Sequence, residues 1–421
     1  MKNIVILGAG FGGLKTALLL DKKISRLRLN EKYKVTLIDK NSYHTYTPTL
    51  YEIATTSKET ADYLDLERIA AFSIGSILEK TKIEFISEEV LDISLAAVEI
   101  NLSTNVVNFD YLVIALGSET NYFNIPGAKD YGLPLKTFRD AAIMRDKIVE
   151  KAYEKKHLNV VICGGGSSGV ELAGELKKWL GGAEEPKCVA DVTIVEGGPN
   201  ILGGFNQEIV KMAAQRLELL GIKIAPGCVI YKVTAETVHL KNGQVLPYDI
   251  FVWTAGTKVP SVIEKLNLQK SAKGLVEVNG KMECLTENTD PQSGSRIYAI
   301  GDIVCFLSPK TGKPTPGVAR AAIVEGAIVA RNIIEAIKTE EGFEKKPIYK
   351  FFKPTQYSYI IPAGGKWAIA CTNTFVFKGY WAWVFKGLVE LGYLLSIMPA
   401  LKALKIWLAG LKIFIKNDRL G

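Results

Sequence analysis

The sequence is poor in the residues that build metal sites and disulfide frameworks. It has only three histidines and six cysteines among 421 residues, and the cysteines are residues 163, 188, 228, 284, 305 and 371. No two of them form a C-x-x-C pair, which argues against a metal site, a disulfide framework and a redox-active dithiol. We therefore expect no bound metal, and the composition suits a reducing compartment.

The sequence also lacks a hydrophobic run long enough to cross a membrane. No stretch reaches the roughly 18 uncharged apolar residues that a spanning helix needs, so we expect a protein that is soluble or bound to a membrane surface. The residues are 48% hydrophobic, which allows large cores, and the length predicts two or three domains. The net charge of +8 is diffuse except near the C-terminus, so nucleic acid is not expected as a partner.

A glycine-rich turn between a strand and a helix is present, and it occurs twice. In the first copy, residues 3–7 predict a buried parallel strand, and Gly8, Gly10 and Gly13 fill the pattern G-x-G-x-x-G. The first glycine allows a tight turn, the second lets a pyrophosphate approach, and the third lets helix and strand pack closely. The next strand ends in Asp39, where an acid can accept a hydrogen bond from a ribose hydroxyl.

The second copy has the same order of elements. A strand ends at Cys163, which we expect to be a small hydrophobe in the core, and the glycines that follow it are Gly164, Gly166 and Gly169. The next strand ends in Glu196. A phosphorylated ribose would place its charge against this carboxylate, and like charges repel, so the sequence favours NADH over NADPH.

The order of the motifs predicts a nested α/β fold. Strands at 111–116 and 250–255 both end in a glycine turn, and the strand at 297–300 runs into Gly301 and Asp302. We therefore expect two nested Rossmann-like dinucleotide-binding domains, with helices over 138–155 and 318–336. The expected bounds are 1–116 with 250–335 for the outer domain, 117–249 for the inner domain, and 336–421 for a C-terminal region.

The C-terminal region predicts short strands followed by amphipathic helices. A helix is expected over 380–397, and a second over 401–416 carries its lysines at 402, 405, 412 and 416 within roughly an 80° arc. A basic helix with a wide apolar face suits an anionic bilayer surface. The alternative is a helix pair packed on the protein or at a dimer interface. We expect a peripheral, monotopic membrane protein.

Taken in order, these motifs resemble the two-dinucleotide-binding-domain flavoproteins, and within them the type II NADH:quinone oxidoreductases. The motifs that carry the resemblance to the flavoproteins are Gly8-x-Gly10-x-x-Gly13 with Asp39, Ala115-Leu116-Gly117, Gly164-x-Gly166-x-x-Gly169, Trp253-x-Ala255-Gly256 and Ala299-Ile300-Gly301-Asp302. Those that narrow it to the quinone enzymes are Asn41 to Ala54, Val170 to Leu176 and Gly379-x-x-Ala382-Trp383.

The resemblance implies FAD in the outer domain and NADH in the inner domain. For FAD it implies Gly8, Gly10, Phe11, Gly12, Gly13, Asp39, Lys40, Ala115, Gly117, Gly301 and Asp302. For NADH it implies Gly164, Gly166, Ser168, Gly169, Glu196, Ala255 and Gly256. It also implies that Glu171 lies near the nicotinamide and flavin rings, where this catalytic candidate would orient the ring or relay a proton. His44 lies in an expected loop and receives no role.

The chain departs from this family at the helix after the Gly-Asp motif. The residues implied on the quinone side are Ala319, Arg320 and Val324, and the last two stand where the family carries glutamines. The identity of the acceptor is therefore open.

The activity implied is hydride transfer from NADH to FAD, then two-electron reduction of a membrane quinone at the cytoplasmic face, without proton pumping. A sulfide:quinone oxidoreductase is one alternative, but it would need paired cysteines and no nicotinamide site. A flavoprotein redox sensor or interaction module with slow turnover is another. The sequence leaves open whether the chain forms a homodimer.

Overall fold

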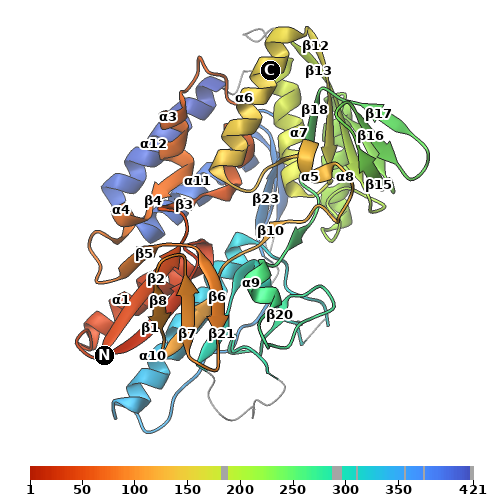
Figure 1. Cartoon of the computed structure of the whole chain (residues 1–421). Helices are drawn as coiled ribbons and strands as arrows, with labels where there is room; N and C mark the ends of the chain where they lie inside the picture. The colour runs from red at the N-terminus through yellow and green to blue at the C-terminus, as the bar shows by residue number, and fades with distance from the viewer. Residues whose placement is uncertain (182–187, 287–295, 310–311, 355–356, 373–374, 418–421) are drawn as a thin grey trace. The chain divides into compact units, whose positions relative to one another are not determined.

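The structure is a computed structural model that describes residues 1–181, 188–286, 296–309, 312–354, 357–372 and 375–417 (Figure 1). The chain divides into two compact units, and each is built from three separate segments. The first unit comprises Met1–His44, Phe72–Glu119 and Lys258–Tyr357. The second unit comprises Thr45–Ala71, Thr120–Thr257 and Ser358–Gly421.

The first unit contains a five-stranded parallel sheet in the order β21-β9-β1-β2-β5. Its strands are β1 (Lys2–Leu7), β2 (Tyr33–Asp39), β5 (Glu84–Ser87), β9 (Tyr111–Ile114) and β21 (Ile297–Ala299). Two long helices, α1 (Phe11–Arg26) and α10 (Ala319–Glu340), pack against each other, and α1 also contacts β1 and β2. An antiparallel meander follows β5, made of β6 (Val90–Ser94), β7 (Glu99–Leu102) and β8 (Val106–Asn108).

The second unit repeats this plan with a parallel sheet in the order β11-β18-β12-β13-β14. Its strands are β11 (Leu133–Pro134), β12 (His157–Cys163), β13 (Val189–Glu196), β14 (Lys223–Pro226) and β18 (Ile250–Trp253). The α-helices in its first two segments are α2 (Leu50–Ala54), α3 (Tyr63–Ala70), α5 (Ala128–Tyr131), α6 (Phe138–Glu154), α7 (Ser167–Leu180) and α8 (Gln207–Leu219). The expectation of two α/β units with parallel sheets is therefore confirmed.

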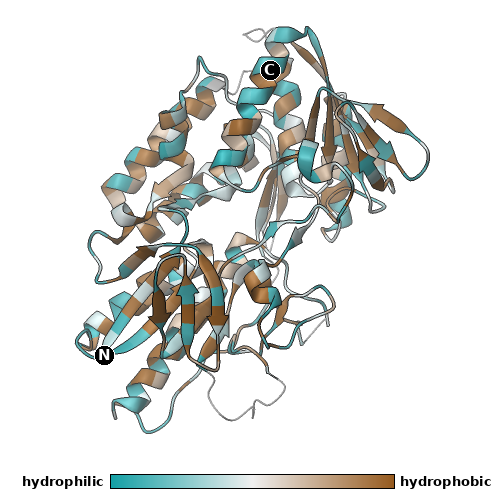
Figure 2. Ribbon diagram, in the orientation of Figure 1, coloured by the Kyte–Doolittle hydropathy of each residue, from teal (hydrophilic) through white to brown (hydrophobic). Residues whose placement is uncertain are grey.

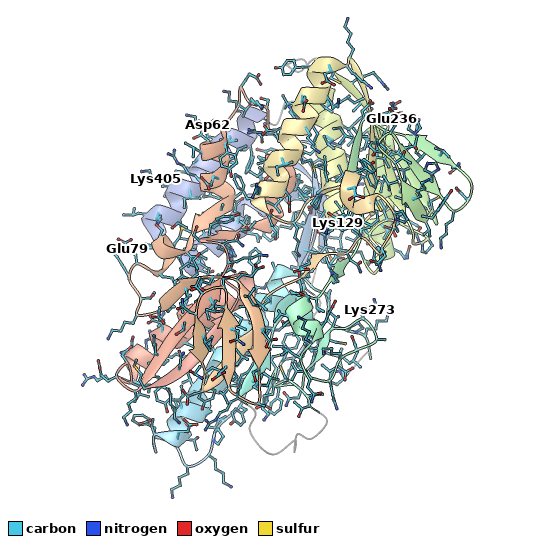
Figure 3. All side chains as sticks on the ribbon, in the orientation of Figure 1. Asp62, Glu79, Lys129, Glu236, Lys273 and Lys405 are labelled. Carbon is cyan, nitrogen blue, oxygen red and sulfur yellow. The ribbon has the colours of Figure 1, made fainter. Side chains whose placement is uncertain are left out.

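The C-terminal part of the second unit begins with an antiparallel sheet of β23 (Tyr359–Pro362), β24 (Ala368–Cys371) and β25 (Val376–Gly379). Helix α11 (Tyr380–Ile397) packs on this sheet, and α12 (Ala400–Asn417) packs against α11 and α3. Apolar and polar residues alternate along α12 (Figure 2), and Figure 3 labels Lys405 on this helix. None of the described helices is both long and apolar enough to cross a membrane.

The helix expectations are close to the structure, but the division of the chain differs from the expected one. Residues 336–357 belong to the first unit and residues 358–421 to the second, instead of forming a separate C-terminal region. The physical reason for the second assignment is packing, since β23 lies against α7 and α8 contacts β24. Residues 45–71 also join the second unit, where α2 packs against α6 and α7.

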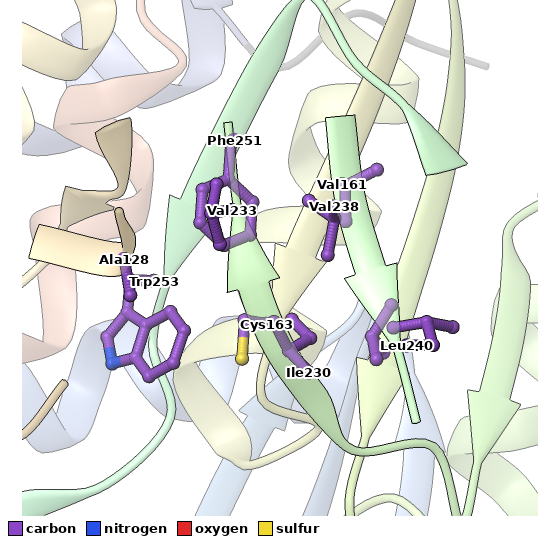
Figure 4. Close-up of a cluster of buried hydrophobic side chains, with 10 residues drawn as sticks. Ala128, Val161, Cys163, Ile230, Val233, Val238, Leu240, Phe251 and Trp253 are labelled. Carbon is purple, nitrogen blue, oxygen red and sulfur yellow. The ribbon is translucent and has the colours of Figure 1, made fainter. Parts of the chain in front are cut away.

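A buried apolar cluster fills the space between the second unit's parallel sheet and the three strands β15 (Ile230–Val233), β16 (Thr237–Leu240) and β17 (Val245–Pro247) (Figure 4). Cys163, Phe251 and Trp253 lie in this cluster. Burial raises the pKa of the Cys163 thiol and keeps it neutral. The prediction that Cys163 is a core hydrophobe is confirmed.

Candidate functional site

Two positions of the first glycine loop (residues 8–13) have no room for any side chain, so only glycine fits there. Gly8 has φ of 100°, and a Cβ on it would lie 2.3 Å from the Ala115 carbonyl oxygen. A Cβ on Gly13 would lie 1.9 Å from the Gly8 carbonyl oxygen. Gly10 caps the N-terminus of α1, and a Cβ there would meet no atom within 4 Å. The turn is therefore packed tightly behind and open in front, at a helix N-terminus that suits a phosphate.

Asp39 closes the first loop from the end of β2. Its Oδ2 accepts a hydrogen bond from the Ala9 N–H at 2.7 Å, and its Oδ1 accepts one from the Asn41 N–H at 2.8 Å. Burial raises the pKa of Asp39, and the backbone donors oppose this by lowering it. Because each carboxylate oxygen has two lone pairs, the side chain can also accept from a ribose hydroxyl. The adjacent Lys40 is exposed and pairs with Glu89 at 3.4 Å.

His44 holds the other side of the same peptide segment. It is 1% exposed, and its Nδ1 lies 2.8 Å from the Ala9 carbonyl oxygen. Burial lowers the pKa of His44 to about 4, so the ring is neutral at pH 7 and donates from Nδ1. The Phe11 ring meets it edge-on, with ring centroids 5.0 Å apart. The Ala9 carbonyl and the Gly10 N–H belong to one peptide group, so His44 fixes the group that faces the open side of the loop.

The second glycine loop (residues 164–169) repeats this geometry in the second unit. Gly164 has φ of 107°, and its Cβ would lie 2.8 Å from the Ala255 nitrogen. A Cβ on Gly169 would lie 2.0 Å from the Gly164 carbonyl oxygen. Gly166 caps α7, and Ser168 is the second residue of that helix. A Cβ on Gly166 would meet nothing within 4 Å, so this turn is also open in front.

Glu196 occupies the place in the second unit that Asp39 has in the first. Its Oε2 accepts from the Gly165 N–H at 2.7 Å, and its Oε1 accepts from the Gly198 N–H at 2.6 Å. The carboxylate is thereby held at the mouth of the second glycine loop. Gly256 follows at the end of β18 with φ of 76°, as Gly117 follows β9 in the first unit with φ of 67°. The two units therefore share one plan residue by residue.

A third group of predicted residues lies at the start of α10 in the first unit. The Gly301 N–H donates to Glu325 Oε2 at 2.7 Å, and the Ser118 hydroxyl donates to Asp302 Oδ2 at 2.8 Å. Burial raises the pKa of Glu325 to about 7. Glu325 was not singled out by the sequence, because its role depends on a contact with a turn 24 residues earlier.

The predicted acceptor residues lie on the first two turns of the same helix. Ala319 and Val324 are half-buried, and Arg320 is exposed. Helix α10 is set close to α1 by two glycines, since a Cβ on Gly326 would lie 2.5 Å from the Gly12 carbonyl oxygen. Gly12 therefore serves a helix crossing, in addition to its place in the first glycine loop.

Glu171 lies on the second turn of α7 and faces a group of charged side chains. It is partly buried, and burial raises its pKa to about 8, while Lys386 lowers the pKa and Glu52 raises it further. Lys386 Nζ lies 2.8 Å from Glu52 Oε1. Neither Lys386 nor Glu52 was predicted as a site residue from the sequence, because they come together only in the folded chain. The four residues Glu52, Glu171, Lys386 and Glu390 are called the buried cluster below.

The turn between β23 and β24 fixes this tail segment on α7. A Cβ on Gly174 would lie 2.6 Å from the Ala363 carbonyl carbon, so α7 and the turn are in backbone contact. Arg216 donates from Nε to the Ala363 oxygen at 3.1 Å and from Nη2 to the Gly364 oxygen at 2.9 Å. Glu175 accepts from the Gly365 N–H at 3.2 Å. The sheet that carries α11 is therefore anchored one turn beyond Glu171.

Comparisons with known proteins show the family of this chain. A family model described as pyridine nucleotide-disulphide oxidoreductase matches residues 2–326. A type II NADH:quinone oxidoreductase from Staphylococcus saprophyticus is 30% identical over 349 residues, which covers 79% of this chain and 82% of the relative.

Solved structures share the fold over nearly the whole chain. The structure of NDH2 from Plasmodium falciparum in complex with NADH has a TM-score of 0.82 at 20% identity and covers 99% of both chains. A sulfide:quinone oxidoreductase from Aquifex aeolicus has a TM-score of 0.75 at 20% identity, covering 97% of this chain and 92% of the other. At these identities the two structures show the fold alone, whereas the family match and the relative show more: this chain belongs to the type II NADH:quinone oxidoreductases, within the pyridine nucleotide-disulphide oxidoreductases.

Proposed function

We propose that the protein oxidises NADH, uses FAD as its bound cofactor and reduces a membrane quinone without pumping protons. The observation that carries this proposal is the pair of matching glycine loops, each open in front of a helix N-terminus and each closed by a carboxylate. A single loop of this kind occurs in many α/β proteins. Two of them in one chain fit a dinucleotide substrate and a dinucleotide cofactor.

We assign FAD to the first unit. The residues present fit the group, since the space in front of Gly10 would admit a pyrophosphate and Asp39 would accept from the ribose. Asp302, oriented by the Ser118 hydroxyl, would bind the ribityl chain. When bound, FAD supplies hydride and electron transfer chemistry, and the protein supplies orientation and exclusion of water. Phe11, Gly117 and Gly301 would also lie next to the cofactor.

We assign NADH to the second unit, with the pyrophosphate at Gly166 and the ribose at Glu196. The Glu196 carboxylate is fixed by two backbone N–H groups, so it cannot easily turn away from a 2′-phosphate. Repulsion between the two charges supports a preference for NADH. Ser168, in the first turn of α7, would add a hydroxyl donor near the phosphates.

Glu171 is assigned a proton-holding role beside the reacting rings. A carboxyl whose pKa is raised to about 8 is largely protonated at pH 7, and a group that titrates near the working pH serves best in proton transfer. Reduction of a quinone to a quinol requires two protons, and NADH brings only one with its hydride. Glu171 is suited to hold the second one.

The decisive experiment separates the two half-reactions. Purified protein is mixed anaerobically with NADH, and then with a short-chain quinone, while the flavin absorbance is followed. We expect rapid bleaching by NADH and rapid recovery with quinone. A colourless, folded protein that has no affinity for FAD would contradict the proposal. Bleaching by sulfide but not by NADH would favour the sulfide:quinone alternative. Slow turnover with NADH and the short-chain quinone would favour a redox sensor.

We further propose that α11 and α12 hold the protein at the cytoplasmic face of a membrane. The exposed apolar side chains on these helices include Trp381, Leu388, Leu395, Leu401, Leu404 and Leu408. Lys405 and Lys412 are exposed on the same α12 helix, and each lysine near an anionic surface contributes about 1 kcal/mol. Part of the α12 apolar face is used inside the protein, since Phe414 is buried and the Trp407 indole donates to the Gly387 carbonyl at 2.7 Å.

Vesicle flotation tests this proposal. The double variant Leu404→Ser with Leu408→Ser should bind anionic vesicles less well than the wild type, because it removes exposed apolar surface and leaves the packed side chains intact. Raised salt should release the wild type only partly, since salt screens the lysines but not the apolar contacts. Wild-type protein that stays off anionic vesicles in low salt would contradict the proposal and favour a homodimer through this face.

A further inference from the structure

The buried cluster joins the tail to the core of the second unit. Glu52 comes from α2, Glu171 from α7, and Lys386 and Glu390 from α11. The cluster thus contains three carboxyl groups and one ammonium group. Three helices that are far apart in the sequence contribute to it, so it can form only when α11 is in its packed position.

The ammonium group of Lys386 is tightly enclosed. Its side chain is 14% exposed, and its Nζ lies 2.8 Å from Glu52 Oε1. The rings of Tyr51 and Phe414 lie 5.1 Å and 5.8 Å from it, and both rings offer a favourable face to a cation. Lys386 therefore stays charged, and the proximity of Glu52 and Glu390 raises its pKa.

The carboxyl groups of the cluster have fewer favourable contacts than the ammonium group of Lys386. Glu52 is 6% exposed, and its second oxygen, Oε2, is buried with no hydrogen-bond partner in the described part of the chain. Glu390 is also 6% exposed. One turn further along α11, the Tyr393 ring stacks on Tyr46 with centroids 5.4 Å apart.

The charge balance of the buried cluster has a physical consequence. If all three carboxyl groups were ionised, one lysine would face three negative charges in an environment with little water. A buried charge without a partner is costly, so such a site takes up protons instead. Burial raises the pKa of Glu390 to about 7, with Glu52 raising it further and Lys386 lowering it. The titratable groups that interact with Glu390 are Glu52, Lys386 and Tyr46, and the Tyr46 ring stacks in turn on Tyr393.

We propose that the protonation state of Glu390 controls how strongly helix α11 packs against the rest of the second unit. Protonated Glu390 stabilises α11 in its packed position, and loss of the proton to water weakens that packing. When α11 separates from the core, Glu390 returns to water and to the ordinary acidity of a glutamate, so the packed state binds more protons than the separated state. The packing is therefore strongest at low pH and is lost progressively as the pH rises through about 7.

Amide hydrogen exchange of the full-length protein tests this inference. Protection of the α11 amides is measured at pH 6 and pH 8, corrected for the intrinsic exchange rate, in wild type and in Glu390→Gln. The variant is a neutral mimic of the protonated side chain and cannot titrate. We expect the ratio of variant to wild-type protection in α11 to rise about tenfold from pH 6 to pH 8, because the wild type loses its proton over this range.

The exposed Glu236, which Figure 3 labels in the second unit, provides the matched control. Glu236→Gln should leave the ratio at one at both pH values. A Glu390→Gln ratio that is the same at pH 6 and pH 8 would overturn the inference. As a second measurement, infrared difference spectra near neutral pH should show the stretch of a protonated carboxyl that Glu390→Gln removes, and its absence from the wild type would overturn the inference too. Neither readout depends on enzyme activity.

Discussion

His44 offers the sharpest test of the electrostatics in the first unit. It is the one fully buried histidine of the three in the chain, since His157 is exposed and His239 is half-buried. Its neutral ring donates to the Ala9 carbonyl oxygen at 2.8 Å. Acid should therefore destabilise the first unit through this residue. The perturbation is a drop in pH, with His44→Gln as the variant that keeps a donor but cannot titrate.

The magnitude follows from the two pKa values of His44. The folded value is about 4 and the ordinary value is 6.5, so the unfolded chain binds the proton first as the pH falls. The contribution of His44 to stability is complete above pH 6.5 and declines below it, until the folded ring is protonated near pH 4. Between pH 7.5 and pH 5.5 the loss amounts to about 1.3 kcal/mol. Because the ring is buried, screening by solvent does not reduce this value.

The assay is urea unfolding at several pH values, followed by circular dichroism. Glu325, Glu171 and Glu390 titrate in the opposite sense, so the overall stability curve is not decisive. The difference between wild type and His44→Gln isolates His44, and this difference should change by about 1.3 kcal/mol over the range. Parallel curves for wild type and His44→Gln from pH 7.5 to pH 5.5 would refute the reasoning.

Three further predictions concern the second glycine loop, the predicted acceptor residues on α10 and the crossing of α1 with α10. Glu196→Ala should narrow the ratio of kcat/KM between NADH and NADPH by about tenfold, because it removes the repulsion described above; a wild type that uses both equally would contradict this. Arg320→Gln should change kcat/KM for the quinone and leave the anaerobic rate of flavin reduction by NADH unchanged, and equal effects on both would indicate a structural role. Gly326→Ala should lower the free energy of unfolding by about 1–3 kcal/mol, since its Cβ meets the Gly12 carbonyl at 2.5 Å. Gly203→Ala, whose Cβ meets nothing within 4 Å, should leave the free energy of unfolding unchanged, and urea unfolding of both variants measures the difference.

The two glycine loops could be predicted from the sequence because their geometry is local. A positive φ at Gly8 and Gly164, a carbonyl within reach of the third glycine, and an acid at the end of the next strand are all set within some 30 residues of chain. The same is true of the helices, whose apolar spacing and caps lie within the segment itself. Helix α11, expected over 380–397, has the same bounds in the structure.

Other features were decided by the tertiary structure alone. Lys386 and Glu52 are 334 residues apart, and no local pattern relates a lysine in an apolar helix to a glutamate in a short one. Burial, which depends on every element packed around a group, raises the pKa of Glu171 to about 8 and that of Glu390 to about 7, and lowers that of His44 to about 4. The sequence by itself therefore determined the fold class, the two dinucleotide loops and the helices. Only the folded chain decided which unit the tail belongs to and which side chains hold protons, because these properties arise from contacts between distant segments and from the exclusion of water.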